Sequence, residues 1–340
     1  MSTPTSTQIT LASRPTGWPT HENFAVATIE LPELVAGEVR VANEFLSVDP
    51  YMRGRMNDVK SYVPPFAIGA PLDGGAVGRV VESASDDLAV GDVVLHQRGW
   101  RDVAQGDASE FRRVDEIPGV PLSAYLGVLG LTGLTAYVGL TVIAPVQEGD
   151  TVFISGAAGA VGSAAGQIAR LKGASRVVGS AGSAEKVDLL TSRYGFDAAL
   201  NYKDAPVREQ LPALVPDGVD VYFDNVGGDH LEAALDVMST NGRVALCGAI
   251  SQYNSTERAA GPDNMSNVVT RSLRLQGFTL AAYFHHMPEF VAEMGPWLAN
   301  GDVVFDETVV DARDDVSGTI DAFLGLLRGE NTGKMVVRTA

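Results

Sequence analysis

Short apolar runs alternate with helical segments between residues 151 and 280, and this alternation constrains the fold more than any other feature. The helical segments span about 10 to 15 residues each. Alternation of this kind is typical of βαβ units, whose strands run parallel and whose crossovers are right-handed. The pattern predicts a doubly wound α/β domain. The apolar runs are "TVFIS", "RVVGS", "AALNY", "VDVYFDNV", "RVALCGA" and "RLQGFTL".

The rest of the chain has a different pattern of apolar residues. Residues 24–115 contain short β-like runs broken by Gly, Pro and Asp, which predict an antiparallel β domain. Residues 123–143 are apolar with small residues at helical spacing, as expected for a buried helical link. A chain of 340 residues favours two domains, and the last β-like runs, "FDETVV" and "GKMVVRT", are expected to rejoin the first of them.

Charge and cysteine content exclude several classes of protein. The chain has 42 acidic and 25 basic residues, a formal net charge of −17, so no nucleic-acid or anionic-membrane partner is expected. Its single cysteine, Cys247, excludes an intramolecular disulfide and a multi-thiolate zinc cluster. The first residues lack a signal-peptide pattern and no apolar run is long enough for a membrane span, so we expect a cytoplasmic protein.

A glycine-rich turn follows the first run of the alternating region. Gly156, Gly159 and Gly162 stand between "TVFIS" and the helical segment "SAAGQIARLKG". Glycine here permits a tight turn and a close approach of the backbone to a pyrophosphate, which then faces a helix N-terminus. The spacing is G-x-x-G-x-x-G, and the same small residues would also suit close helix packing without a ligand.

The next strand bears on which nicotinamide cofactor would bind. After "RVVGS", where an NAD enzyme places an acid on the ribose hydroxyls, this chain has Ala181 and Gly182. Lys186 follows one turn later and can meet a 2′-phosphate. Alternatively, Lys186 is a solvated helix-start cation and Glu185 contacts the ribose. The missing acid favours NADPH over NADH.

Several motifs taken together resemble one family. The chain is similar to the zinc-independent medium-chain dehydrogenase/reductases, and within them to the branch of leukotriene hydroxydehydrogenase/prostaglandin reductases, plant alkenal reductases and bacterial curcumin-type reductases. The likeness runs in order from about residue 40 to residue 338. It rests on "LSVDPYMRGRM", "GLTGLTAYVGL", "SGAAGAVGS", "AGSAEKVDLL", "NYK", "YFDNVGG", "CGAISQYN", "LQGF" and "GENTGKMVV".

The resemblance implies two domains and a cofactor. It implies a GroES-like β-rich substrate domain, formed by residues 1–125 with 301–340, beside a doubly wound Rossmann domain of residues 126–300. NADPH would lie between them without a metal ion. The resemblance also implies a homodimer formed through the sheet edge near residues 273–281.

The resemblance further implies which residues hold NADPH. The glycine turn would bind the pyrophosphate, and residues after the next two strands would meet the adenosine end. Residues of "DNVGG" and of Cys247–Tyr253 would line the nicotinamide ribose, while residues of "GFTLAA" and "GENTGK" would hold the carboxamide. The implied set is Ala158, Gly159, Ala160, Val161, Gly162, Gly182, Lys186, Tyr202, Asn225, Cys247, Ile250, Thr279, Leu280, Ala281 and Asn331.

Three tyrosines are candidates for contact with substrate. Tyr51 and Tyr253 match positions near the substrate in the family and are the catalytic candidates; their ordinary alternatives are a structural aromatic and a loop-packing residue. Some members have a proton-donating tyrosine soon after the "GF" pair, whereas this chain has alanines before Tyr283. The metal-binding members carry a cysteine where this chain has Asp49 and Pro50. No metal site is therefore expected.

The implied reaction is reduction of the C=C bond of α,β-unsaturated aldehydes or ketones. Hydride reaches the β-carbon, negative charge collects on the carbonyl oxygen as an enolate, and the α-carbon is protonated. The alternatives are an NADPH quinone reductase and an NADPH-binding sensor without turnover. The apolar and aromatic segments around Tyr51, Tyr253 and Tyr283 favour a hydrophobic enone, alkenal or quinone. His285 and His286 are interpreted as a solvated or interface pair, and Cys247 as a small residue of the cofactor cleft.

Overall fold

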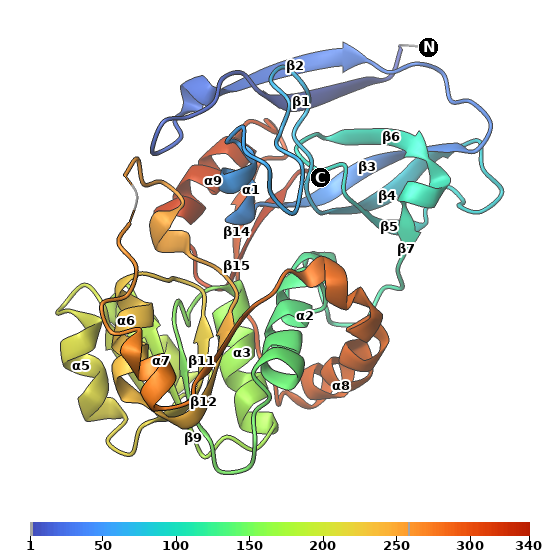
Figure 1. Ribbon diagram of the computed structural model, residues 1–340. Coiled ribbons are helices and arrows are strands. Elements are labelled where there is room, and N and C mark those ends of the chain that lie inside the picture. The colour runs from blue at the N-terminus through green and yellow to red at the C-terminus, as the bar shows by residue number, and fades with distance from the viewer. Residues whose placement is uncertain (1–2, 258) are drawn as a thin grey trace. The chain divides into compact units, whose positions relative to one another are not determined.

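The computed structural model describes residues 3–257 and 259–340, which divide into two compact units. Unit 1 contains the described residues up to Leu126, with Glu307–Asn331 and Met335–Ala340. Unit 2 contains the described residues of Gly127–Asp306, with Thr332–Lys334. Figure 1 shows both units.

Unit 2 is built on a six-stranded sheet with the strand order β10-β9-β8-β11-β12-β13. All five neighbouring pairs are parallel. The chain adds β9 and β10 on one side of β8 and then β11, β12 and β13 on its other side. This strand order is that of a doubly wound dinucleotide-binding fold. The strands are β8 (Thr151–Ile154), β9 (Arg176–Ala181), β10 (Ala198–Asn201), β11 (Val219–Asp224), β12 (Met238–Leu246) and β13 (Arg274–Gly277).

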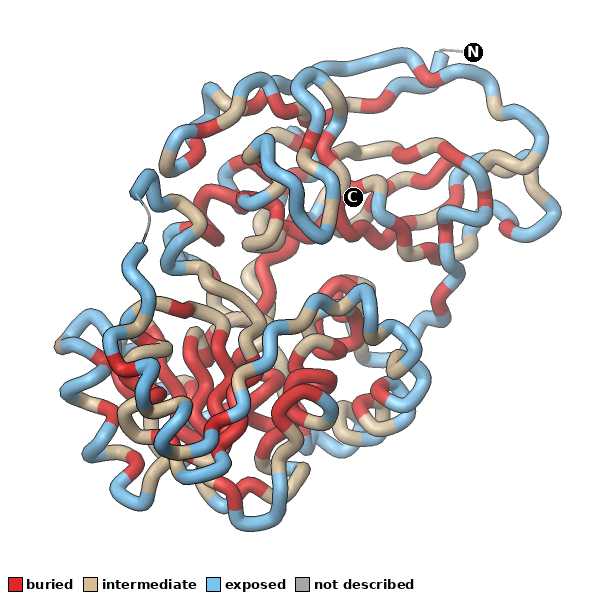
Figure 2. Tube along the Cα trace, viewed as in Figure 1, coloured by how far each residue is buried: buried red, intermediate tan, exposed pale blue. Residues whose placement is uncertain are grey.

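Helices cover both faces of this sheet. Figure 1 shows α5, α6 and α7 on one face and α2 and α3 on the other, and the strands between them are largely buried in Figure 2. The helices are α2 (Leu131–Val138), α3 (Ala160–Leu171), α4 (Ala184–Ser192), α5 (Val207–Leu214), α6 (Asp229–Val237), α7 (Ser266–Thr270) and α8 (Met287–Asn300). Shorter turns are η4 (Gly139–Ile143), η5 (Ile250–Gln252) and η6 (Leu280–His286).

Small residues let these helices approach the sheet closely. A side chain on Gly139 would collide with the buried Phe223 ring, and one on Gly166 with the ring of Phe196. On the opposite side of the sheet, Phe153 and Tyr222 stack with ring centroids 5.1 Å apart inside an apolar cluster. The apolar runs at the centre of the sheet, β8, β9 and β11, are therefore buried on both faces, as in other parallel sheets.

Unit 1 is a β-rich domain. Its seven-stranded sheet has the order β14-β15-β3-β4-β5-β7, with β6 paired to β3, and β1 and β2 form a separate antiparallel pair. The strands are β1 (Thr5–Leu11), β2 (Phe24–Glu30), β3 (Glu38–Ser47), β4 (Ala76–Ser83), β5 (Val93–His96), β6 (Val103–Asp107), β7 (Arg112–Arg113), β14 (Glu307–Asp311) and β15 (Lys334–Arg338). Because β15 pairs antiparallel with β3, the end of the chain completes a sheet begun about 300 residues earlier.

Unit 1 has its own apolar core, packed around aromatic rings. Trp100 stacks on Phe24 at 5.9 Å and meets Phe323 of α9 edge-on at 5.6 Å. The helical elements are α1 (Tyr51–Arg55), α9 (Gly318–Leu327), η1 (His21–Asn23), η2 (Ala108–Glu110) and η3 (Leu122–Leu126).

The fold class predicted from the sequence is confirmed. A GroES-like β-rich unit accompanies a doubly wound Rossmann unit. Among the described residues, no helix is long and apolar enough to cross a membrane.

Candidate functional site

The glycine turn joins β8 to α3 at the carboxyl edge of the unit 2 sheet. Gly156 adopts a φ of 60°, which favours glycine, and Gly159 is the N-cap of α3. A Cβ on Gly162 would overlap the Gly156 carbonyl oxygen and lie 2.7 Å from the Ala157 Cα. The first turn of α3 therefore lies directly against the turn backbone. Its N–H groups, which have no acceptor within the helix, mark a place suited to a phosphate.

The residues predicted for the adenosine end lie after β9, which pairs with β8, and after β10, which pairs with β9. The Tyr202 hydroxyl lies over Gly182, where an added Cβ would be 2.5 Å from that oxygen. The Ser183 hydroxyl caps α4 by accepting from the backbone N–H of Lys186 at 3.3 Å. Gly182, Lys186 and Tyr202 are thus brought together at one edge of the sheet.

Lys203 is a member of this group that the sequence reasoning missed. Burial lowers the pKa of Lys186, and the neighbouring positive charge of Lys203 lowers it further. Two cations in a chain of net charge −17 therefore repel each other here, an arrangement that an anion between them stabilises. The signal was present in the motif "NYK", because the residue after Tyr202 belongs to the same turn.

A buried carboxylate organises the loop after β11. Asp224 is 1% exposed, and its Oδ1 accepts from the hydroxyls of Ser155 and Tyr222 at 3.1 and 2.7 Å. The same oxygen accepts from the N–H groups of Val226 and Gly227 at 2.9 and 2.8 Å. Four donors on one carboxylate oxygen hold the "DNVGG" loop against β8, a role that the sequence reasoning did not assign.

Asn225, predicted for the nicotinamide ribose, is tied to the glycine turn. Its side-chain amide donates to the Ser155 carbonyl oxygen at 2.8 Å, and its backbone N–H donates to the Ser155 hydroxyl at 2.9 Å. Its own carbonyl accepts from the N–H of Ile250 at 3.3 Å. Asn225 and Ile250 therefore lie at the same strand-end loop cluster.

The segment from Cys247 to Tyr253 follows β12 and folds over the same edge. The Cys247 N–H donates to the Asp224 carbonyl at 2.9 Å, and burial raises the pKa of its thiol to about 12. The thiol is therefore protonated at neutral pH. The Tyr253 hydroxyl accepts from the N–H of Ala249 at 3.4 Å, and burial raises the pKa of Tyr253, so this hydroxyl keeps its proton and can donate it in a hydrogen bond.

The last predicted residues of unit 2 follow β13. Thr279 and Ala281 are exposed and Leu280 is partly buried at the start of η6. The Tyr283 ring meets Phe278 edge-on at 6.2 Å and lies 6.4 Å from both His285 and His286.

The histidine pair beside Tyr283 has a surface carboxylate partner. The His286 Nδ1 lies 3.1 Å from the exposed Glu289, one turn along the chain.

Two predicted residues belong to unit 1. Tyr51 begins α1, and its ring packs against the apolar core of that unit. Burial, and then the charge of Asp49, raise the pKa of its hydroxyl. Asn331 is 8% exposed and follows α9. The described residues contain no cluster of three His, Cys, Asp or Glu side chains that could hold a metal ion.

Two family models match the chain. The N-terminal domain of oxidoreductase matches residues 7–114, and the zinc-binding dehydrogenase model matches residues 160–295.

Full-length relatives are also found. The NADPH-dependent curcumin reductase of Escherichia coli is 42% identical over 97% of this chain and 96% of its own. The 2-alkenal reductase (NADP(+)-dependent) of Nicotiana tabacum is 40% identical over 97% of this chain and 96% of its own. The crystal structure of CurA in complex with NADPH from Vibrio vulnificus has a TM-score of 0.92 at 43% identity, covering 98% of this chain and 99% of that one.

Proposed function

Because this chain belongs to the medium-chain dehydrogenase/reductase family, in the branch of the prostaglandin, alkenal and curcumin reductases, we propose that it reduces C=C bonds of α,β-unsaturated aldehydes and ketones with NADPH. The observation that carries this proposal is the likeness to these reductases over nearly the whole chain. Curcumin and 2-alkenals share a C=C bond conjugated to a carbonyl group, and that shared group defines the substrate class.

Unit 2 contains residues that fit NADPH. The turn Ala158–Gly162 offers a close backbone approach and the α3 N-terminus to the pyrophosphate. Lys186, Tyr202 and Lys203 suit the 2′-phosphate, because the charges of the two lysines lie near each other and the Tyr202 hydroxyl lies over Gly182. Asn225, Cys247 and Ile250 are proposed for the nicotinamide ribose, and Thr279, Leu280 and Ala281 for the carboxamide end. Asn331, which belongs to unit 1, is proposed for the carboxamide end as well. When bound, NADPH supplies the hydride for the β-carbon.

The protein's own task is to orient the acceptor and to stabilise the enolate. The proposed group for this is the Tyr253 hydroxyl, which stays protonated at neutral pH and can donate to the carbonyl oxygen as negative charge collects there. The neighbouring Cys247 keeps its proton, so it offers no competing nucleophile. Tyr51 and Tyr283 are proposed as further contacts with a hydrophobic substrate.

The proposal includes a homodimer in the cytoplasm. Strand β13 is the last in the order of the unit 2 sheet, and Arg274, Gln276 and Gly277 of this strand are exposed. Edge-to-edge pairing of two β13 strands would extend the sheet across a twofold axis. Light scattering after gel filtration is expected to give twice the chain mass of 35.8 kDa, and a monomer at micromolar concentration contradicts this part of the proposal.

The test is an absorbance assay with both cofactors and three classes of acceptor. NADPH oxidation is expected with trans-2-alkenals and enones, with NADPH preferred over NADH, and the product is the saturated carbonyl compound. The Tyr253→Phe variant is the matched comparison for enolate stabilisation. Faster turnover of quinones than of enones would favour a quinone reductase. Absence of turnover with every acceptor, although NADPH binds, would indicate a sensor.

A further inference from the structure

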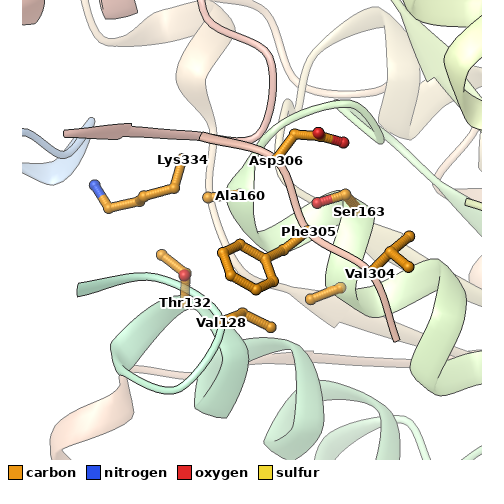
Figure 3. A pocket seen from close by; sticks show the side chains of 9 residues that line it. Val128, Thr132, Ala160, Ser163, Val304, Phe305, Asp306 and Lys334 are labelled. Carbon is orange, nitrogen blue, oxygen red and sulfur yellow. The ribbon is translucent and has the colours of Figure 1, made fainter. Parts of the chain in front are cut away.

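The glycine turn is attached, within unit 2, to a segment far along the chain. The Gly333 N–H donates to the Ala158 carbonyl at 2.8 Å, and Gly333 pairs with Gly159 in a parallel bridge. Figure 3 shows the small pocket beside this attachment, which has room for about one water molecule. The turn is therefore held here by contacts that do not involve the loops after β11 and β12. The pocket is lined by Val128, Thr132, Ala160, Ser163, Ala164, Val304, Phe305, Asp306 and Lys334.

Ser155, the residue before Gly156, attaches the turn to the loop after β11 as well. The Asn225 side-chain amide donates to the Ser155 carbonyl at 2.8 Å, and the Asn225 N–H donates to the Ser155 hydroxyl at 2.9 Å. The fully buried Ser155 hydroxyl donates in turn to the Asp224 Oδ1 at 3.1 Å. Only the last of these hydrogen bonds uses the Asp224 carboxylate. Loss of that carboxylate would therefore leave the turn attached.

The Asp224 carboxylate has a different effect on the loops after β11 and β12. It accepts from the N–H groups of Val226 and Gly227 at 2.9 and 2.8 Å. The Val226 carbonyl accepts from the Ser251 N–H at 3.2 Å and from the Ser251 hydroxyl at 2.6 Å. Gly227 has a φ of 69°, and a Cβ added to it would lie 3.2 Å from the Ala249 Cβ. The two loops are therefore hydrogen-bonded and closely packed at the place that the carboxylate fixes.

Tyr253 lies at the end of these contacts. Its hydroxyl accepts from the Ala249 N–H at 3.4 Å, and a Cβ added to Gly248 would lie 3.4 Å from the same oxygen. Gly248 is itself attached to β11, because its N–H donates to the Asp224 carbonyl at 3.0 Å. The place of the Tyr253 hydroxyl therefore depends on the loop after β12, and the place of that loop depends on the residues that the Asp224 carboxylate holds.

We propose that Asp224 is a positioning residue, whose carboxylate holds the Tyr253 hydroxyl at the place, relative to the glycine turn, from which it donates to the enolate. The inference rests on the proposed function, because it assigns that donation to Tyr253. Asp224 is 1% exposed, so it acts through other residues and not by contact with the substrate. A displacement of about 1 Å at a reacting group can lower a rate by about 100-fold, so small shifts of this loop matter.

A double-mutant cycle on the full-length protein tests this role. Stopped-flow absorbance with saturating NADPH and a trans-2-alkenal measures the rate of hydride transfer. Asp224→Asn is expected to lower this rate by about 10-fold, because weaker hydrogen bonds let the loops shift. In the Tyr253→Phe background the same change should lower the rate by less than about twofold, since the hydroxyl that it positions is gone. A purely structural carboxylate would instead give the full 10-fold loss in both backgrounds.

Two further variants keep the test decisive if Asp224→Asn folds poorly. Ser251→Ala removes the hydroxyl that donates to the Val226 carbonyl and is expected to slow hydride transfer by a few-fold, again only when Tyr253 is present. Tyr222→Phe, the matched control, removes a donor to the same Asp224 oxygen from within β11 and should leave the rate within about twofold of the wild type.

Three results would overturn the assignment of Asp224. They are a wild-type rate in folded Asp224→Asn, an equal loss with and without the Tyr253 hydroxyl, and a wild-type rate in Tyr253→Phe, which would leave no hydroxyl to position. If the wild-type protein reduces none of the acceptors, the proposed function itself fails.

Discussion

Replacement of Lys186 by methionine tests whether the group after β9 selects NADPH. The substitution keeps most of the aliphatic stem, so the packing of α4 and its Ser183 cap should remain. It removes one of the two positive charges that meet at this end of the sheet. NADH lacks the 2′-phosphate, so its affinity reports any general damage to the site.

The expected loss can be worked out from the surroundings of Lys186. A hydrogen bond to a charged group contributes about 1.5–3 kcal/mol to binding. The loss should lie near the lower end of this range, because Lys203 and the Tyr202 hydroxyl remain to hold the phosphate. A loss of about 1.5–2 kcal/mol corresponds to about a 10- to 30-fold rise in the Kd of NADPH. The Kd of NADH should change by less than about twofold.

Titration of the intrinsic cofactor fluorescence at two salt concentrations measures both constants. The discrimination between NADPH and NADH should fall with added salt in the wild type and depend less on salt in Lys186→Met. Arg112→Met, which removes an exposed cation from β7 of unit 1, is the control for net charge and should leave discrimination unchanged. Equal weakening of NADPH and NADH in Lys186→Met would refute the assignment of Lys186 to the 2′-phosphate.

Four other changes test the remaining parts of the site. Tyr253→Phe should lower kcat for enone reduction by about 10- to 100-fold with little change in the Kd of NADPH, since one hydrogen bond to the enolate is lost; stopped-flow measurement of the hydride step checks this. Asp224→Asn should lower the free energy of unfolding by about 2–4 kcal/mol in urea titrations, because the neutral amide oxygen would accept from the four donors without the negative charge that strengthens these hydrogen bonds. Gly333→Ala should weaken both dinucleotides, because a Cβ would displace the backbone that donates to the Ala158 carbonyl of the glycine turn. Alkylation of Cys247 by iodoacetamide should be slow at pH 7 and rise about tenfold per pH unit up to pH 10, because its thiol is protonated below a pKa of about 12.

Each of these four predictions has a result that would contradict it. An unchanged hydride step in Tyr253→Phe would leave the enolate to another donor. A stable Asp224→Asn protein would show that the loop after β11 does not depend on the carboxylate. Wild-type dinucleotide affinity in Gly333→Ala would mean that the backbone adjusts without disturbing the glycine turn. An alkylation rate that levels off near pH 8.5 would indicate an ordinary exposed thiol.

Local patterns were sufficient to predict the doubly wound unit. The central strands β8, β9 and β11 are short apolar runs buried on both faces, and the intervening helices have their own periodicity, so strand and helix could be separated without tertiary information. Unit 1 was predicted less completely. β1, β6 and α1 were not assigned. β6 and α1 have only five residues each, too few to show a period.

Residues of the candidate site that belong to a sequence motif could be identified from the sequence. Residues whose role depends on neighbours from other parts of the fold could not. Gly162 and Lys186 stand at fixed offsets from a strand end, so their expected places follow from the turn and the helix. Asp224 was missed because its role depends on four donors that converge only in the folded loop. Lys203 was missed because its effect on Lys186 acts across two strand ends.

The sequence by itself determined the alternation of strands and helices, the glycine turn, the absence of an acid after β9 and the family. Only the tertiary structure decided that Gly333 pairs with Gly159 from 174 positions further along the chain, and that Lys334 lines the same pocket as Thr132 and Ala160. The physical reason is the range of the interactions. Periodicity and turn chemistry are set by residues close in the sequence. The energetic effect of a buried charge or a buried hydroxyl depends instead on groups that folding brings together from distant parts of the chain.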